Sequence, residues 1–193
     1  MKDPNLYVLT GGPGAGKTTL LDELQRRGFS CIPEVARQII QEQVQTAGTA
    51  LPWSDTARYA KLMLERSILS FCEHTPALQI TFCDRGIPDT LCYLRLIGDD
   101  DIDAVAASMA YRYAHKVFLA TPWREIYTTD TDRKQSFEEA VTTCHLMAKV
   151  YEECGYEVVQ LPLVSPAKRA EFILEHVQKV VPSRLPIPAS IPR

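Results

Sequence analysis

The segment GGPGAGKTT, residues 11 to 19, constrains the fold more than any other part of the 193-residue chain. It matches the pattern GxxxxGK[ST], follows the apolar run Leu6 to Thr10 and precedes a helical pattern over residues 17 to 27. A strand before the pattern and a helix after it make the match specific. Glycines let backbone N–H groups turn inward around an anion, and the helix N-terminus adds positive potential. The segment predicts a phosphate-binding loop, although such a turn could also merely link strand and helix.

Side chains in this loop supply further groups for a nucleoside triphosphate. Lys17 is a mobile cation beside the phosphates, and the Thr18 hydroxyl is a predicted Mg²⁺ ligand. We therefore expect Mg²⁺ and ATP to bind here. The residues predicted to bind the nucleotide in this loop are Gly12, Gly14, Ala15, Gly16, Lys17, Thr18 and Thr19.

The rest of the chain alternates between strand and helix patterns. Five short runs rich in β-forming residues predict strands at Leu6–Thr10, Phe29–Ile32, Leu78–Cys83, Lys116–Ala120 and Tyr156–Leu161. Helical patterns lie between them, at 17–27, after Pro33, and at 55–74, 88–97, 102–114, 136–155 and 165–182. This alternation predicts an α/β fold with a doubly wound, five-stranded parallel sheet.

We predict one P-loop NTPase domain over residues 1–181, because a chain of this length can bury a single substantial core. The remaining segment, 182–193, contains four prolines and is predicted to be an extended or mobile tail. Ser136 with Glu139 forms a capping-box pattern that marks the start of one late helix.

Candidate catalytic side chains follow the predicted strands, whose carboxyl ends should form the ligand crevice. Asp84 closes the apolar run ITFC, as a magnesium-associated acid does, and is a predicted metal ligand. Arg85 follows it where a hydrolytic ATPase would usually carry a second acid, so transfer to an acceptor is favoured over hydrolysis. The alternative is that Asp84 caps the next helix and Arg85 is its surface partner.

Glu34 lies just beyond the second predicted strand, in the sequence IPEVAR. There it could accept a proton from an acceptor hydroxyl, while Arg37, one turn later, could hold the acceptor or its phosphate. The alternative is an acid that complements the helix dipole, with Arg37 as a solvated neighbour.

The polar segment TPWREIYTTDTDRKQSFEEA carries Arg124, Arg133 and Lys134. Spaced cations on a loop between two firm elements could close over the nucleotide and stabilise the transferring charge. We predict Arg133 as the catalytic cation and Arg124 as a nucleotide-binding residue. Ordinary surface arginines would give the same pattern.

Composition and charge argue against several other classes of protein. The formal net charge of −3 provides no general attraction to nucleic acid or to an anionic membrane. Six cysteines without CxxC spacing indicate reduced thiols, and no apolar run approaches eighteen residues, so we expect a cytoplasmic protein without membrane insertion.

The acids at 99, 100, 101 and 103 follow Gly98 and are read as helix caps, and the four scattered histidines do not suggest zinc. Asn5 is the only asparagine, which excludes the guanine-selective NKxD motif.

The combination of GGPGAGKTT, PEVAR, CDRGIPD and TPWREIYTTDTDRKQSFEEA resembles the AAA-type predicted ATPases that look like nicotinamide riboside kinase and, more distantly, thymidylate and deoxynucleoside kinases. The resemblance extends to about Val181. It implies a kinase-like P-loop fold with strand order 2-3-1-4-5, Mg-ATP in the loop, a functional Asp84-Arg85 pair, and a lid near residues 124–133. An animal relative acts as a nucleotide- and phosphoinositide-binding trafficking protein, which implies a non-enzymatic alternative.

These observations predict a Mg-ATP-dependent kinase that transfers the γ-phosphate to a hydroxyl of a small, nucleoside-like acceptor. The catalytic residues would be Lys17, Glu34, Asp84, Arg85 and Arg133. Two alternatives stay open, a plain ATPase and a nucleotide-dependent binding module. The acceptor's identity and the quaternary state are open as well, with a homodimer among the possibilities.

Overall fold

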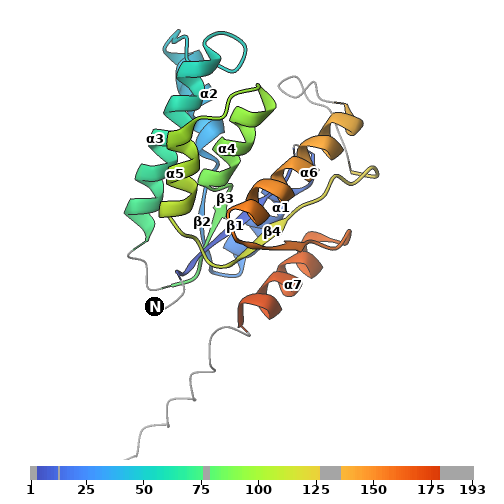
Figure 1. Cartoon of the computed structure of the whole chain (residues 1–193). Coiled ribbons are helices and arrows are strands. Elements are labelled where there is room, and N and C mark those ends of the chain that lie inside the picture. Colours follow the sequence, from blue (N-terminus) through green and yellow to red (C-terminus); the bar gives the residue numbers. More distant parts are fainter. Residues whose placement is uncertain (1–3, 13, 76–78, 127–135, 179–193) are drawn as a thin grey trace, which may run out of the picture.

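A computed structural model describes residues 4–12, 14–75, 79–126 and 136–178 of the chain. Five parallel strands form one sheet in the order β2-β3-β1-β4-β5 (Figure 1). The strands are β1 (Leu6–Thr10), β2 (Ser30–Ile32), β3 (Thr81–Asp84), β4 (Lys116–Leu119) and β5 (Glu157–Gln160). The predicted fold class and the strand order implied by the resemblance are both confirmed.

Seven helices connect and cover these strands within the described residues. They are α1 (Lys17–Arg26), α2 (Val35–Gln45), α3 (Thr56–His74), α4 (Ile87–Leu96), α5 (Ile102–Ala110), α6 (Phe137–Glu153) and α7 (Pro166–Gln178). Each lies where a helical pattern was predicted. The largest difference is at α5, which ends four residues before the predicted limit of 114, because the chain leaves the helix there and Ala114 N–H donates to Leu6 O beside β1.

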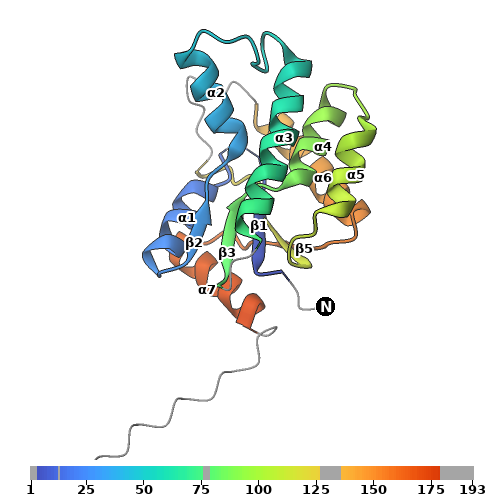
Figure 2. The same ribbon diagram turned by 90° about the vertical axis from the view of Figure 1, so that its left-hand side faces the viewer.

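The central strand β1 separates two hydrophobic layers. Its side chains alternate between faces, as in any strand. Leu6 and Val8 join a cluster formed with α3, α4, α5 and α6, whereas Tyr7 and Leu9 join a cluster formed with α1 and α7. Figure 2 shows α1 and α7 on one side of the sheet and α3, α4, α5 and α6 on the other. Both faces are thus covered, which explains why all five β1 residues are buried.

Strand register decides which residues meet at the carboxyl edge of the sheet. Leu9 of β1 is paired with Asp84 of β3, and Thr10 is paired with Leu119 of β4. The chain that continues from Thr10 into the glycine loop therefore lies between the ends of β3 and β4. This places Asp84 beside the start of the loop, as the topology of a parallel sheet requires.

Helix caps follow the sequence pattern. Ser136 and Glu139 form the predicted capping box at the start of α6. Asp101 caps α5 by accepting a hydrogen bond from Asp103 N–H, so the acidic cluster before that helix includes the predicted cap. Within the described residues, no group of three or more His, Cys, Asp or Glu side chains is arranged to hold a metal ion.

Two predicted features fall outside the described residues. These are the proline-rich segment 182–193 and the part of the polar segment that contains Arg133 and Lys134. In the part of the chain that is described, no helix combines the length and the apolar content needed to cross a bilayer.

Candidate active site

The glycine loop joins the end of β1 to the start of α1, and its backbone depends on glycine. Gly11 has φ of 137° and Gly16 has φ of 78°, conformations that side chains disfavour. A Cβ atom on Gly11 would lie 2.2 Å from Ala120 O, because the loop passes directly over the end of β4. No side chain caps α1 at Gly16. The first amides of α1 are therefore available to an anion.

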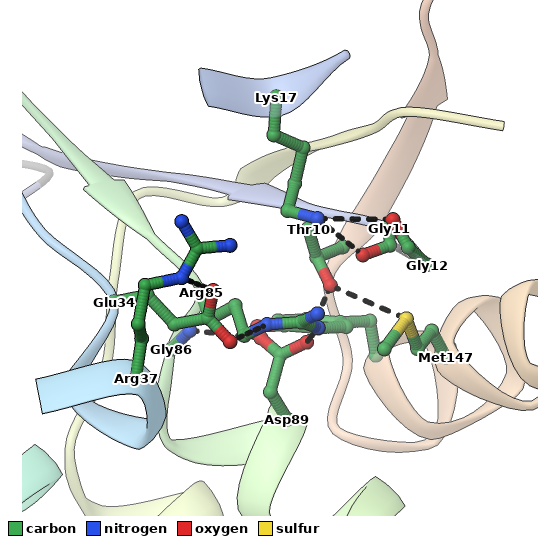
Figure 3. Close-up of polar contacts among 11 residues, drawn as sticks. Thr10, Gly11, Gly12, Lys17, Glu34, Arg37, Arg85, Gly86, Asp89 and Met147 are labelled. Carbon is green, nitrogen blue, oxygen red and sulfur yellow. Dashed lines mark hydrogen bonds and ion pairs between the residues drawn. The ribbon is translucent and has the colours of Figure 1, made fainter. Parts of the chain in front are cut away.

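Lys17 lies under the loop and is 8% exposed. Its Nζ donates to Gly11 O at 2.7 Å and to Gly12 O at 3.1 Å (Figure 3). Burial and the nearby Arg85 lower the pKa of Lys17 from its usual 10.5 to about 8, although three surrounding carboxylates oppose this shift. Burial thus destabilises the protonated form of Lys17, and a bound anion would stabilise it.

Arg85 connects two carboxylates beside the loop. Its Nε donates to Glu34 Oε1 at 2.9 Å, and its Nη1 donates to Asp89 Oδ1 at 3.2 Å (Figure 3). Burial alone would lower the pKa of Arg85, but Glu34, Asp89 and Asp84 together raise it, so the guanidinium stays charged. The structure therefore brings the predicted residues Glu34 and Arg85 into direct contact, across 51 positions of sequence.

Arg85 also has an unusual backbone. Its φ is 73°, in the left-handed region that a residue with a long side chain seldom adopts. Arg85 N–H donates to Leu9 O, so the turn after β3 is tied to the last residues of β1. Strained backbone of this kind concentrates at functional sites, where surrounding contacts hold it in place.

Asp89 was not predicted as a site residue, yet it organises this cluster. The carboxylate is 4% exposed and accepts hydrogen bonds from Thr10 Oγ1 at 2.5 Å, Tyr151 OH at 2.6 Å and Gly86 N–H at 2.8 Å. Together with Arg85 Nη1, these donors satisfy a buried charge that would otherwise be costly. The only sequence signal was the spacing of Gly86 and Asp89 in CDRGIPD, which lets the Asp89 carboxylate accept a hydrogen bond from Gly86 N–H at the start of α4.

Asp84 ends β3 and is not part of this hydrogen-bond network. Burial raises the pKa of its carboxyl group, while Lys17 acts in the opposite direction. Its Oδ1 is buried without a hydrogen-bond partner among the described residues. An unsatisfied buried carboxylate oxygen calls for an explanation, and a cation or a donor from a ligand would provide one. Thr18, the other predicted metal ligand, exposes its side chain at the start of α1.

A small cavity opens beside these charged groups. It lies among β2, α2, α3 and β3, and its charged wall consists of Glu34, Asp84, Arg85 and Asp89. Met63, Ser67, Ser70 and Phe71 of α3 line the opposite wall. The volume open to water-sized molecules is about 30 Å³, room for roughly two waters, and the cavity is partly open to solvent.

Arg37 and Arg124 lie at the margins of the site. Arg37 is half-exposed, with its Nε 4.0 Å from Glu34 Oε2. Arg124 is exposed and contacts the start of α6, with its guanidinium 4.2 Å from the Phe137 ring. Arg124 is thus held by α6 in this structure. Ile126, two residues later, would lie 3.2 Å from a Cβ on Gly16, so this segment runs alongside the glycine loop.

Arg169 of α7 supports the loop from the other side and had no sequence signal. Its Nη1 donates to Ala15 O at 2.8 Å, its Nε donates to Pro162 O at 2.9 Å, and the guanidinium lies 5.3 Å from the Trp123 ring. Nη2 is buried without a partner in the described part of the chain. These contacts link the loop to the segment after β5.

Comparison with known proteins agrees with this geometry. A family model described as an AAA domain matches residues 6–169. No curated protein matches the chain. Solved structures that share the fold include two kinases and a NadR protein, at sequence identities low enough that they inform on fold alone.

The first is a shikimate kinase from Acinetobacter baumannii in complex with shikimate, at 16% identity and TM-score 0.57, covering 92% of this chain and 94% of that one. A NadR protein in complex with NR is 18% identical with TM-score 0.68, and the match covers 98% of this chain but 54% of the NadR chain. A thymidylate kinase from Ehrlichia chaffeensis is 15% identical with TM-score 0.59, covering 91% and 99% of the two chains. With its glycine loop, parallel sheet and strand order, the chain belongs to the AAA domain family and has the fold of P-loop nucleoside and nucleotide kinases.

Proposed function

We propose that the protein is a Mg-ATP-dependent kinase that transfers the γ-phosphate to a hydroxyl of a nucleoside-like acceptor. The observation that carries this proposal is the position of Asp84 between the phosphate loop and a cavity walled by Glu34 and Arg85. Its buried Oδ1 has no hydrogen-bond partner in the part of the chain that the structure describes. A donor site and an acceptor site share one wall. Such an arrangement suits transfer between two bound ligands.

The loop residues would bind the triphosphate of ATP. The amides of Gly12 and of residues 14 to 19 offer N–H groups, and Lys17 would exchange its two carbonyl contacts for phosphate oxygens. The buried ammonium of Lys17 would then contact anionic oxygens in place of two neutral carbonyl oxygens. Lys17 would then stabilise negative charge on the transferring phosphoryl group.

The Thr18 hydroxyl and Asp84 would hold Mg²⁺, whose positive charge would offset the negative charge of the phosphates. The donor set fits this hard cation, because both groups offer oxygen and Mg²⁺ keeps several waters. Among the described residues, no donor would compete with the metal for Asp84 Oδ1.

Glu34 would orient the acceptor hydroxyl. Burial raises its pKa, but Arg85 and Lys17 outweigh burial and hold the pKa below its usual value, so Glu34 is ionised at neutral pH. A weakly basic carboxylate suits a loose phosphoryl transition state, in which the attacking oxygen needs alignment more than early deprotonation. Arg85 would stabilise charge at the same point, assisted by Arg133, the catalytic cation predicted from the sequence.

The experiment is a turnover assay with a panel of acceptors. Protein and Mg-ATP are incubated with nucleosides, nucleoside monophosphates and sugars, and ADP and phosphorylated acceptor are both quantified. We expect ADP release that depends on an acceptor and equals the amount of phosphorylated product. Asp84→Asn should abolish turnover, whereas Asp22→Asn, the same change on the exposed face of α1, should preserve it.

Two other outcomes would contradict the kinase proposal. ADP release independent of any acceptor, and lost in Asp84→Asn, would identify an ATPase. Nucleotide-dependent binding of a protein or lipid without turnover would identify a binding module.

A further inference from the structure

Helix α5 carries an apolar stripe on the side that faces solvent. Ile102, Val105 and Met109 are 81%, 39% and 54% exposed, and Ala106 is exposed between them. Residues spaced by three, four and seven positions lie on one face of a helix, so these four side chains are neighbours and are called the α5 stripe below. The opposite face of α5 is buried and packs against α4.

The described part of the chain leaves the α5 stripe uncovered. Helix α5 lies at the outer edge of the helical layer, at the front in Figure 1 and at the right in Figure 2. Among the described large apolar side chains, that of Ile102 is the most exposed. Leu96 and Ile97, where α4 ends and the chain turns towards α5, are also exposed. The largest apolar patches on soluble proteins, of roughly 300–600 Å², are often binding sites.

The two ends of α5 carry opposite charges. Near its N-terminus, Asp99 and Asp103 are exposed and, unlike Asp100, form no ion pair within the described residues. Arg112 follows the C-terminus of α5. Its Nη1 donates to Cys154 O at 2.7 Å, and no described carboxylate contacts the guanidinium. Two acids and one guanidinium thus lack ionic partners at opposite ends of the same helix.

We infer that the α5 stripe is a dimer interface at which two copies of this chain pack with their α5 helices antiparallel. A two-fold axis between Val105 and Ala106 places Ile102 of one protomer against the partner's Met109, and the reverse. The small side chain of Ala106 at the centre allows the two helices to approach closely.

Charge complementarity selects this occupant and this orientation. In the antiparallel register, Asp99 of one protomer lies towards the end of the partner helix that carries Arg112. The contact occurs twice, once on each side of the axis. A parallel arrangement would instead bring the acidic ends together, where like charges repel.

The size of the interface sets its strength. One helix face with its flanking residues covers less than the roughly 800 Å² per partner that is typical of stable complexes, so the dimer is weak, with a Kd in the micromolar range. It is also independent of the proposed kinase function, because no residue of α5 belongs to the described lining of the cavity beside Asp84.

The test is sedimentation equilibrium of the full chain between about 1 and 200 μM. The average mass should rise with concentration from that of one chain towards that of two. Ile102→Glu places a charge in the stripe and should weaken the dimer about tenfold or more. Leu69→Glu makes the same kind of change on α3, at a leucine that is 60% exposed, and should leave the dimer unaltered. A monomer at every concentration, or a dimer that survives Ile102→Glu in a variant folded by circular dichroism, would overturn the inference.

Cysteine cross-linking tests the orientation. In a Cys72→Ser background, which removes the exposed native thiol, a mixture of Ile102→Cys and Met109→Cys proteins should form a disulfide-linked dimer under mild oxidation. Each of these two proteins alone should cross-link at least several-fold less, because the register keeps identical ends apart. Stronger cross-linking of Ile102→Cys with itself than with Met109→Cys would contradict the antiparallel arrangement.

A charge reversal tests the electrostatic part of the argument. Asp99→Lys should weaken the dimer about threefold or more, since it brings a cation towards the partner's Arg112. Asp22→Lys makes the same change on the exposed face of α1 and serves as its control. Equal effects of the two substitutions would contradict the proposed pairing of the helix ends.

Discussion

Lys17 provides a prediction that connects the stability of the protein to its phosphate site. In the nucleotide-free fold the ammonium is buried, and the pKa of Lys17 is lowered to about 8 from 10.5. Burial is the largest cause, followed by the charge of Arg85. The unfolded chain has no such burial, so its Lys17 titrates near the usual value.

The sign of the pH dependence follows from these two values. Between pH 8 and pH 10.5 the unfolded chain binds one more proton at Lys17 than the folded protein does. The free energy of unfolding therefore rises with pH through this interval. The difference between the two pKa values corresponds to about 3 kcal/mol in total and about 1.4 kcal/mol per pH unit. Below pH 8 the folded protein carries the full cost of the buried charge.

The assay compares urea denaturation of the wild type and Lys17→Met at several values between pH 7.5 and 10. Cysteines and tyrosines also titrate in this range, but they are common to both proteins and cancel in the difference. We expect the wild type to gain about 2 kcal/mol relative to the variant between pH 8 and 9.5. A difference that stays flat across this range would refute the account of Lys17.

Binding of Mg-ATP should reverse the downward shift of the Lys17 pKa. Phosphate oxygens favour the protonated ammonium, so the pKa of Lys17 should rise when Mg-ATP is bound. The affinity of the wild type for a Mg-bound ATP analogue should then fall as pH increases above 8. Calorimetry in buffers of different ionisation enthalpy would detect the linked proton uptake, and no uptake at pH 8.5 would contradict the assignment.

Three further substitutions, with Gly28→Ala as a control, test the loop and its surroundings. Gly11→Ala should destabilise the fold by about 3 kcal/mol or more in urea denaturation, because its Cβ would meet Ala120 O at 2.2 Å, whereas Gly28→Ala, with open space around it, should cost only about 1–2 kcal/mol. Tyr151→Phe removes a donor to a buried carboxylate and should cost about 2 kcal/mol by the same measurement. Asp84→Asn should raise the urea midpoint of the nucleotide-free protein at pH 7, since burial raises the pKa of Asp84 and disfavours its charge; a lowered midpoint would contradict this.

Much of the fold could be predicted because local signals agreed with each other. The five strand runs, the glycine loop and the capping box of Ser136 each have a short-range physical cause that one sequence displays. Strand ends were less accurate: β3 begins at Thr81, three residues after the predicted start, and includes Asp84. Apolar residues alone do not show where ladder hydrogen bonds begin.

Part of the arrangement of the candidate site could also be predicted from short-range signals. Glu34 and Arg85 follow strand ends, and adjacent parallel strands bring such residues together. Asp89 and Arg169 could not be found in this way, because each depends on contacts between helices and the loop that no spacing reveals. Asp89 reads as an ordinary first-turn acid, and Arg169 as an ordinary helix arginine, until their buried partners are known.

The central claim is that the glycine loop binds a nucleoside triphosphate with Mg²⁺. Its most direct measurement is calorimetric titration of ATP into the full chain with Mg²⁺ and with EDTA, for the wild type and Lys17→Met. We predict saturable binding by the wild type that weakens without the metal and is lost in the variant. No binding by the wild type under either condition, or equal binding by both proteins, would contradict the account.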